Sequence, residues 1–129
     1  MKVRVGRKEY KVKRRVVEPP HLSLLVQDID YDDVEVFLVD ETGGVAELIV
    51  VVREADRLMA APEHISFLIK TIEGLFSAYD ESCDAWIDYM DDEHDVLVLN
   101  VWTTSTALRL AETSWIGLWK RLAKRIKKK

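Results

Sequence analysis

The chain has 129 residues, of which 48% are apolar and 33% charged, with 19 Lys and Arg against 23 Asp and Glu. This length predicts one domain, residues 1–129, and the apolar share excludes a wholly disordered chain. The longest apolar run, residues 48–52, is far shorter than the roughly 20 residues that span a membrane. No apolar stretch follows the basic start, so we expect no secretory signal. The single cysteine, Cys83, permits no internal disulfide, and we expect a reducing, cytoplasmic location.

The charges are segregated along the chain. Residues 1–15 hold eight basic groups and one acidic group, and residues 120–129 hold seven basic groups and no acidic group. The 104 residues between them hold four basic and 22 acidic groups. Three interpretations stay open: the basic ends bind an external polyanion, lie against the acidic middle of the same chain, or meet the acidic middle of a neighbouring copy.

The composition also indicates a source. The chain contains one Asn and one Gln, while its charged fraction exceeds the typical value of about 25%. Few amides together with many charged residues are typical of hyperthermophile proteins. We therefore interpret the source as a thermophilic archaeon or one of its viruses.

The first half of the chain predicts strands. Apolar and basic residues alternate over 3–5 and 10–13, which predicts a β-hairpin with a cationic outer face around a turn at 6–9. Pro19-Pro20 ends this run, and a short strand over 21–27 precedes an acidic loop at 28–33. Two central strands follow, over 34–39 and 45–52, with both faces at least partly covered. Residues 40–44 join them, and Gly43-Gly44 suits a tight turn.

The second half predicts helices and a further hairpin. A short helical piece is expected over 54–60, and apolar residues at helical spacing predict an amphipathic helix over 62–79. Strands over 83–90 and 96–103 flank an acidic loop at 91–95, and Ser105 is expected to cap a last helix over 106–127. The order β-β-β-β-β-α-β-β-α predicts an α+β fold, a mainly antiparallel sheet with two amphipathic helices packed on one face.

The last predicted helix has two opposite faces. Trp115, Leu118, Trp119 and Leu122 share the apolar face, and basic residues fill the other. Such a helix can lie on an anionic membrane, dock in a partner groove or bind nucleic acid. We expect residues 106–119 to pack on the core instead, which does not favour a membrane surface, and residues 120–129 to project or fray.

Motifs for chemistry are weak. The carboxylates at 28–33 and 91–95 lack the spacing of a calcium or zinc site, so we predict no metal and no cofactor. Cys83 is expected to be a small apolar residue of a strand rather than a nucleophile. A remote alternative is a metal-dependent nuclease built on Asp40 and Glu47, which can approach across a hairpin. No small-molecule substrate is inferred.

The main functional hypothesis is therefore a small non-enzymatic binding module that contacts an anionic partner. Nucleic acid is the first candidate, bound without sequence preference through phosphate contacts. The alternative hypothesis is a homo-oligomeric assembly protein. The residues expected to contact the anion are Arg4, Arg7, Lys8, Lys11, Lys13, Arg14, Arg15, Lys120, Arg121, Lys124, Arg125 and Lys127.

Overall fold

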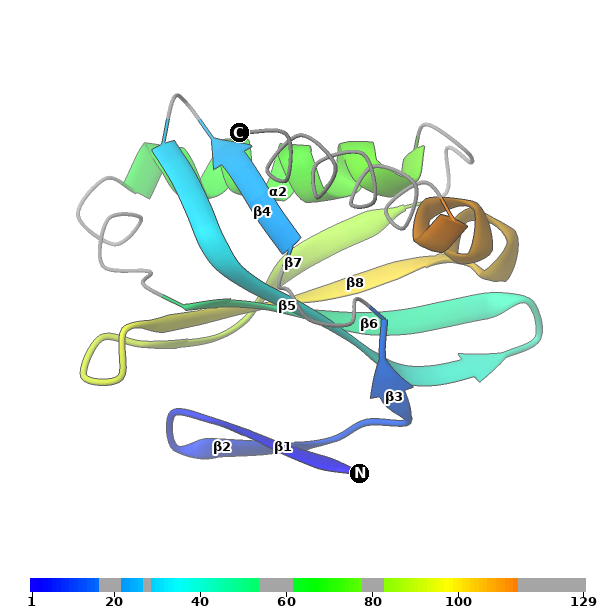
Figure 1. The fold of residues 1–129 in the computed structure, drawn as a ribbon, viewed down its shortest axis with the longest axis horizontal. Coiled ribbons are helices and arrows are strands. Elements are labelled where there is room, and N and C mark those ends of the chain that lie inside the picture. Colours follow the sequence, from blue (N-terminus) through cyan, green and yellow to red (C-terminus); the bar gives the residue numbers. More distant parts are fainter. Residues whose placement is uncertain (17–21, 27–28, 54–61, 78–82, 114–129) are drawn as a thin grey trace, which may run out of the picture.

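The computed structural model describes residues 1–16, 22–26, 29–53, 62–77 and 83–113. These residues form the strands and the helix named below, and a helical segment at residues 105–113 follows the last strand (Figure 1). The elements are β1 (Lys2–Val5), β2 (Lys8–Lys11), β3 (Arg14–Arg15), β4 (Leu22–Val26), β5 (Ile29–Thr42), β6 (Val45–Arg53), α2 (Pro62–Ser77), β7 (Asp84–Asp91) and β8 (Val96–Thr104). The predicted α+β class with a mainly antiparallel sheet is confirmed.

The main sheet is antiparallel and runs in the order β3-β5-β6-β8-β7. Strand β4 also pairs with β5, so β3 and β4 share the long β5 as their partner. Three register shifts interrupt the ladders, between Leu22 and Leu24, between Leu38 and Asp40, and between Ile87 and Tyr89. Bulges of this kind bend and twist a strand, and Figure 1 shows β5 curving across the sheet.

Two apolar clusters form, one on each face of the sheet. On one face, α2 and the helical segment 105–113 bury Leu68, Ile72, Phe76, Leu108 and Ala111 against inward side chains of β5, β6 and β8. This is the expected arrangement of helices on one face. Leu68 and Ile72 lie one turn apart, as helical periodicity requires.

The opposite face is covered by the β1-β2 hairpin, which forms a separate two-stranded sheet (Figure 1). Val5 and Val12 pack there on Phe37, Ile49 and Val51 of the main sheet. The fold therefore has three layers: helices, main sheet and hairpin. The predicted arrangement, a mainly antiparallel sheet with helices on one face, did not include this hairpin layer. Alternation within a hairpin does not specify the surface on which the hairpin packs.

Several predicted boundaries also need correction. Residues 29–33 belong to the continuous strand β5 and are not an acidic loop, and the connection between β5 and β6 is only the Gly43-Gly44 turn. Lys8 and Glu9 belong to β2, so the first turn is Gly6-Arg7. Asp and Glu disfavour strands intrinsically, but pairing with β4 and β6 outweighs that preference.

The start and end of the helices differ in detail from expectation. The N-cap of the segment 105–113 is Thr104, whose Oγ1 accepts a hydrogen bond of 3.1 Å from the backbone N–H of Ala107. Ser105, the expected cap, is already helical. The helix α2 begins at Pro62 as predicted. The expected helical piece at 54–60 and the part of the last helix beyond 113 lie outside the described residues. No helix among the described residues is long and apolar enough to cross a membrane.

Candidate functional site

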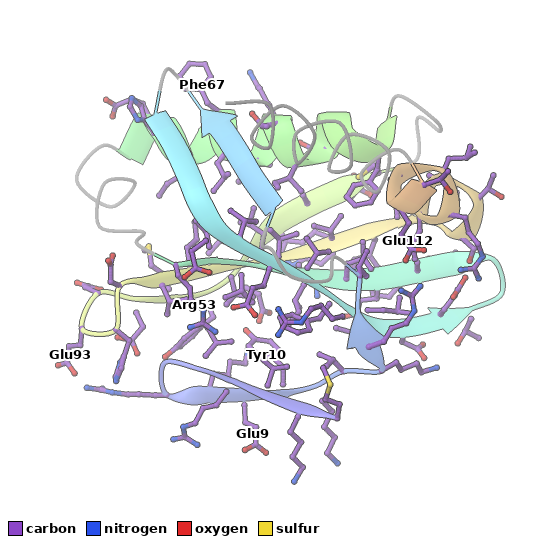
Figure 2. The ribbon with its side chains drawn as sticks, viewed as in Figure 1. Glu9, Tyr10, Arg53, Phe67, Glu93 and Glu112 are labelled. Carbon is purple, nitrogen blue, oxygen red and sulfur yellow. The ribbon has the colours of Figure 1, made fainter. Side chains whose placement is uncertain are left out.

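Most of the N-terminal cations predicted to bind an anion contact carboxylates of the same chain. Five of these cations form ion pairs. The pairs are Arg7–Glu93, Lys8–Asp88, Lys13–Asp40, Arg14–Glu112 and Arg15–Glu35. The acceptors come from β5, β7, the β7-β8 turn and the helical segment 105–113, so the N-terminal region is electrostatically joined to several elements (Figure 2).

The outward face of the hairpin keeps three cations. The register pairs Lys2 with Lys11 and Arg4 with Glu9 on this face, and Figure 2 shows Glu9 pointing away from the main sheet while Tyr10 points toward it. Lys2 lies 3.6 Å from Glu9. Arg4 and Lys11 are exposed and form no ion pair with any described residue. The predicted cationic outer face thus consists of Lys2, Arg4 and Lys11, with Glu9 beside them.

The basic residues predicted near the C-terminus lie outside the described residues. They are Lys120, Arg121, Lys124, Arg125 and Lys127. Their contact with an anionic partner stays a prediction.

A two-arginine clamp holds the buried Glu35 on β5. Arg15 Nη1 donates to Oε2 at 2.8 Å and Arg53 Nε donates to Oε1 at 2.7 Å, so both carboxylate oxygens are engaged. Arg15 also lies over the ring of Phe37, with its guanidinium carbon 4.9 Å from the ring centroid. Burial raises the pKa of Glu35, but the hydrogen bonds and charges of Arg53 and Arg15 outweigh it and lower that pKa overall. The clamp ties β3 and β6 to the strand between them.

A second polar network joins the hairpin turn to the β7-β8 turn. The backbone N–H of Arg7 donates to Tyr89 Oη at 3.0 Å, and that hydroxyl donates to Asp91 Oδ2 at 2.7 Å. His94 Nδ1 lies 2.8 Å from the same oxygen, while the backbone N–H of Glu93 donates to Asp91 Oδ1. The Tyr89 hydrogen bond, followed by the His94 contacts, lowers the pKa of Asp91 to about 2. Asp91 therefore orders this turn as a charged acceptor.

The hairpin has a second polar attachment, at Asp88 on the bulge of β7. Lys8 Nζ donates to Asp88 Oδ2 at 2.9 Å and Tyr10 Oη donates to the same oxygen. Lys8 also lies over the ring of Tyr10, with its ammonium nitrogen 4.8 Å from the centroid. Burial and the neighbouring Asp88 carboxylate raise the pKa of Tyr10. The bulge places the Asp88 carboxylate where the hairpin can reach it.

The fold gives little support to the nuclease, metal and thiol chemistry considered from the sequence. Asp40 and Glu47 are Cα partners across β5 and β6, as the nuclease alternative requires, but Lys13 lies 3.2 Å from Asp40 and Asn100 donates to Glu47. No cluster of three or more metal-ligating side chains is found among the described residues. At Cys83, burial and then the charges of Glu73 and Asp84 raise the thiol pKa to about 11.

The hairpin leaves one corner of the sheet uncovered. This open corner consists of Val45 and Glu47 on β6, Asp84 and Trp86 on β7, and Asn100 and Trp102 on β8. The register places them on one face, because Trp86 pairs with Asn100 while Trp102 pairs with both Asp84 and Glu47. Trp86 is 45% exposed and Trp102 is 41% exposed. In Figure 1 the hairpin lies beneath the left and central part of the sheet, and the corner is at the right-hand ends of β6 and β8.

The sequence contained part of the signal for this corner. Asp84 and Trp86 alternate with Cys83 and Ala85, which predicts that they share one face of β7. Trp102 and Glu47 are far apart in the sequence and join them only through the pairing of β6 with β8 and of β8 with β7. Alternation within one strand does not specify the neighbouring strand.

Comparisons with protein-family models, with curated proteins and with solved structures found no match to this chain. Any function assigned to it therefore depends on its own geometry.

Proposed function

We propose that the chain is a non-enzymatic assembly module whose copies bind one another through the open corner. The observation that carries this proposal is the pair of exposed indoles, Trp86 and Trp102, at diagonal positions on neighbouring strands. Large aromatic side chains are typical anchors of protein interfaces, because they bury much apolar area with little loss of conformational freedom. Val45, 41% exposed, extends the apolar surface beside them.

Strand β7 supports the same proposal. It is the last strand of its sheet, and among the described residues it pairs only with β8. Its outer edge therefore offers backbone donors and acceptors to another chain. Ile87 and Met90, which are 41% and 45% exposed on the helix-side face, make both sides of this edge partly apolar.

Charge complementarity favours a second copy as the partner. Five of the N-terminal cations contact carboxylates of their own chain, whereas Asp84 and Glu47 form no ion pair with any described residue. Residues 120–129 carry seven basic groups and no acidic group. Each copy thus brings both a basic segment and an acidic corner. A reciprocal exchange gives a closed dimer, and a one-way contact gives a ring or filament.

Sedimentation equilibrium of the pure full-length chain tests this function. We expect a mass above 14.9 kDa that rises with protein concentration and falls as salt screens the charges. Replacing both indoles, Trp86→Ser with Trp102→Ser, should weaken self-association at least about tenfold, since interface aromatics commonly contribute more than 1.4 kcal/mol each. Leu110→Ser is the matched control, because Leu110 is 46% exposed on the helical segment, which packs on the face of the sheet opposite to the open corner. A wild-type chain that stays monomeric at every concentration overturns the proposal.

A second candidate function is contact with a polyanion, nucleic acid first. It is favoured by Lys2, Arg4 and Lys11 on the outward hairpin face, where only Glu9 lies beside them. Titration of labelled duplex DNA, single-stranded DNA and RNA, followed by anisotropy at two salt concentrations, tests it. The logarithm of the binding constant should fall by roughly 0.9 for each phosphate contact on duplex DNA when the salt concentration rises tenfold. Arg4→Glu with Lys11→Glu should abolish it, Lys70→Glu on α2 should not, and absence of binding at low salt contradicts it.

A further inference from the structure

Asn100 in the open corner has a nearly buried side-chain amide, and the oxygen of this amide accepts no hydrogen bond from any described residue. The residue is 8% exposed, and its Nδ2 donates to Glu47 Oε2 at 2.9 Å. Its Oδ1 is buried and has no hydrogen-bond partner among the described residues. Buried acceptors are nearly always paired, so an unpaired one indicates a missing donor.

The residues that neighbour Asn100 on this face of the sheet share one chemical preference. Trp86 is the Cα partner of Asn100, and Trp102 lies two residues farther along β8 on the same face. Two carboxylates, Glu47 and Asp84, both lie opposite Trp102 on the neighbouring strands. An acceptor oxygen, two indole faces and two carboxylates together favour a cationic donor, because ammonium and guanidinium groups bind all three.

We propose that this corner binds a lysine or arginine side chain from the basic segment 120–129 of a second copy. The inference rests on the proposed assembly function and identifies the contact that produces it. The cation donates to Asn100 Oδ1, lies against the indoles of Trp86 and Trp102, and is neutralised by Glu47 and Asp84.

The distribution of cations points to that segment. Within residues 16–113, Arg53 contacts Glu35 and Arg109 contacts Glu41, whereas Lys70 is a single exposed positive charge on α2. Residues 120–129 concentrate seven basic groups in ten positions without an acid, and Trp119 directly precedes them in the sequence. No other stretch of such positive charge has a tryptophan beside it.

A charge-swap experiment on the full chain tests the pairing. The corner variant carries Glu47→Lys with Asp84→Lys, and the tail variant carries Lys124→Glu, Arg125→Glu, Lys127→Glu and Lys128→Glu. Each alone should self-associate at least tenfold more weakly than the wild type. Mixed in equal amounts, they should regain a mass above the monomer, because each basic group again faces an acid. The matched control, Glu63→Lys with Asp92→Lys, changes net charge by the same amount at exposed positions outside the corner and should leave association unchanged.

The variant Asn100→Leu tests the cation site independently of the corner variant, in case that variant folds poorly. It removes the unpaired acceptor at similar volume, so the chain should retain its circular dichroism spectrum while self-association weakens at least tenfold. Unchanged association in Asn100→Leu contradicts the cation site.

The outcomes separate the two proposals. A monomeric wild type overturns both. An oligomer that is weakened by the tryptophan substitutions but unchanged in the tail variant keeps the assembly function and overturns the basic-segment contact. Failure of the mixed variants to regain mass, while each alone is monomeric and folded, also overturns that contact. Regained mass in the mixture supports both proposals.

Discussion

At Glu35, two arginines reverse the effect of burial on a carboxyl group. Burial alone favours the neutral acid, yet Arg53 and Arg15 each donate to one oxygen and lower the pKa overall. A carboxyl group whose pKa is lower in the folded state stabilises the fold above its unfolded pKa, about 4.3. That contribution is lost as the pH falls through the folded pKa.

Glu35→Gln tests this reasoning. The substitution keeps the shape but removes the charge, and we expect a loss of roughly 2 kcal/mol in the free energy of unfolding at neutral pH, as for a lost hydrogen bond to a charged group. Because glutamine does not titrate, the decline in stability between about pH 5 and pH 3 should be shallower in the variant. Urea denaturation at several pH values measures both effects. Asp92→Asn in the exposed β7-β8 turn is the control, and an equal loss in that variant would contradict the clamp.

The thiol of Cys83 should react slowly. Its pKa is raised to about 11 by burial and by Glu73 and Asp84, and the thiolate is the reactive form. Alkylation by iodoacetamide at pH 8 should therefore be at least about tenfold slower in the folded chain than in the same chain unfolded in urea. The rate should rise steeply toward pH 11. Equal rates in folded and unfolded protein would show that Asp84 and burial do not govern this thiol.

Among the elements, the first hairpin turn depends on a glycine for two reasons. Gly6 has φ of +59°, and a Cβ there would lie 2.8 Å from Asp91 Oδ2 and 3.0 Å from Tyr89 Oη. Gly43 has nearly the same backbone conformation, φ of +62°, but nothing lies within 4 Å of its Cβ position. Comparing substitutions at these two glycines therefore distinguishes the cost of backbone strain from the cost of the close approach of the hairpin turn to β7.

Alanine substitution at these glycines gives a paired prediction. Gly43→Ala should cost about 1 kcal/mol, the strain of a left-handed backbone with a side chain. Gly6→Ala should cost roughly 2–3 kcal/mol, because the added methyl also displaces the Asp91 and Tyr89 network. Thermal unfolding of both variants measures the difference. Equal losses would contradict the close packing of the hairpin turn on β7.

The start of the last helical segment provides a third comparison. Thr104 accepts the hydrogen bond from the Ala107 N–H, so Thr104→Ala should destabilise the chain by about 1 kcal/mol. Thr106→Ala, at an exposed position in the first turn, should have no destabilising effect, since alanine is the better helix former. Chemical denaturation of the two variants checks this, and a larger loss for Thr106→Ala would contradict the capping role.

In the whole molecule, the main sheet is a central layer with a core on each face. Phe37 on β5, beneath the hairpin, is fully buried, and so is Phe76 of α2 in the core on the opposite face. Phe37→Ala should therefore cost about 3–5 kcal/mol, the usual loss for truncating a buried phenylalanine. Phe67, 40% exposed on α2, is the control, and its alanine variant should lose less than about 1 kcal/mol. A small loss for Phe37→Ala in urea denaturation would show that the hairpin is not part of the cooperative core.

The sequence by itself determined the fold class and most of the elements, but not the short strand β3. The nearly continuous apolar run over residues 45–52 and the helical spacing over 62–79 are local patterns, and each reflects how side chains project from a strand or a helix. Gly43-Gly44 marked a turn for an equally local reason, its positive φ. The strands β1 and β8 and the start of α2 follow from the same rules, with errors of a few residues where charged positions join a strand.

Only the tertiary structure decided which of these elements meet. Nothing in Tyr10 or Lys8 specifies Asp88, about 80 residues away in the chain, and nothing in Trp86 specifies Trp102 or Glu47. Such contacts depend on strand order and register, which are set by the total burial of all the faces rather than by any one segment. For the same reason the sequence left three interpretations of the N-terminal charges open. The packing of the N-terminal region on the main sheet placed five of those cations against carboxylates of their own chain and left the open corner acidic.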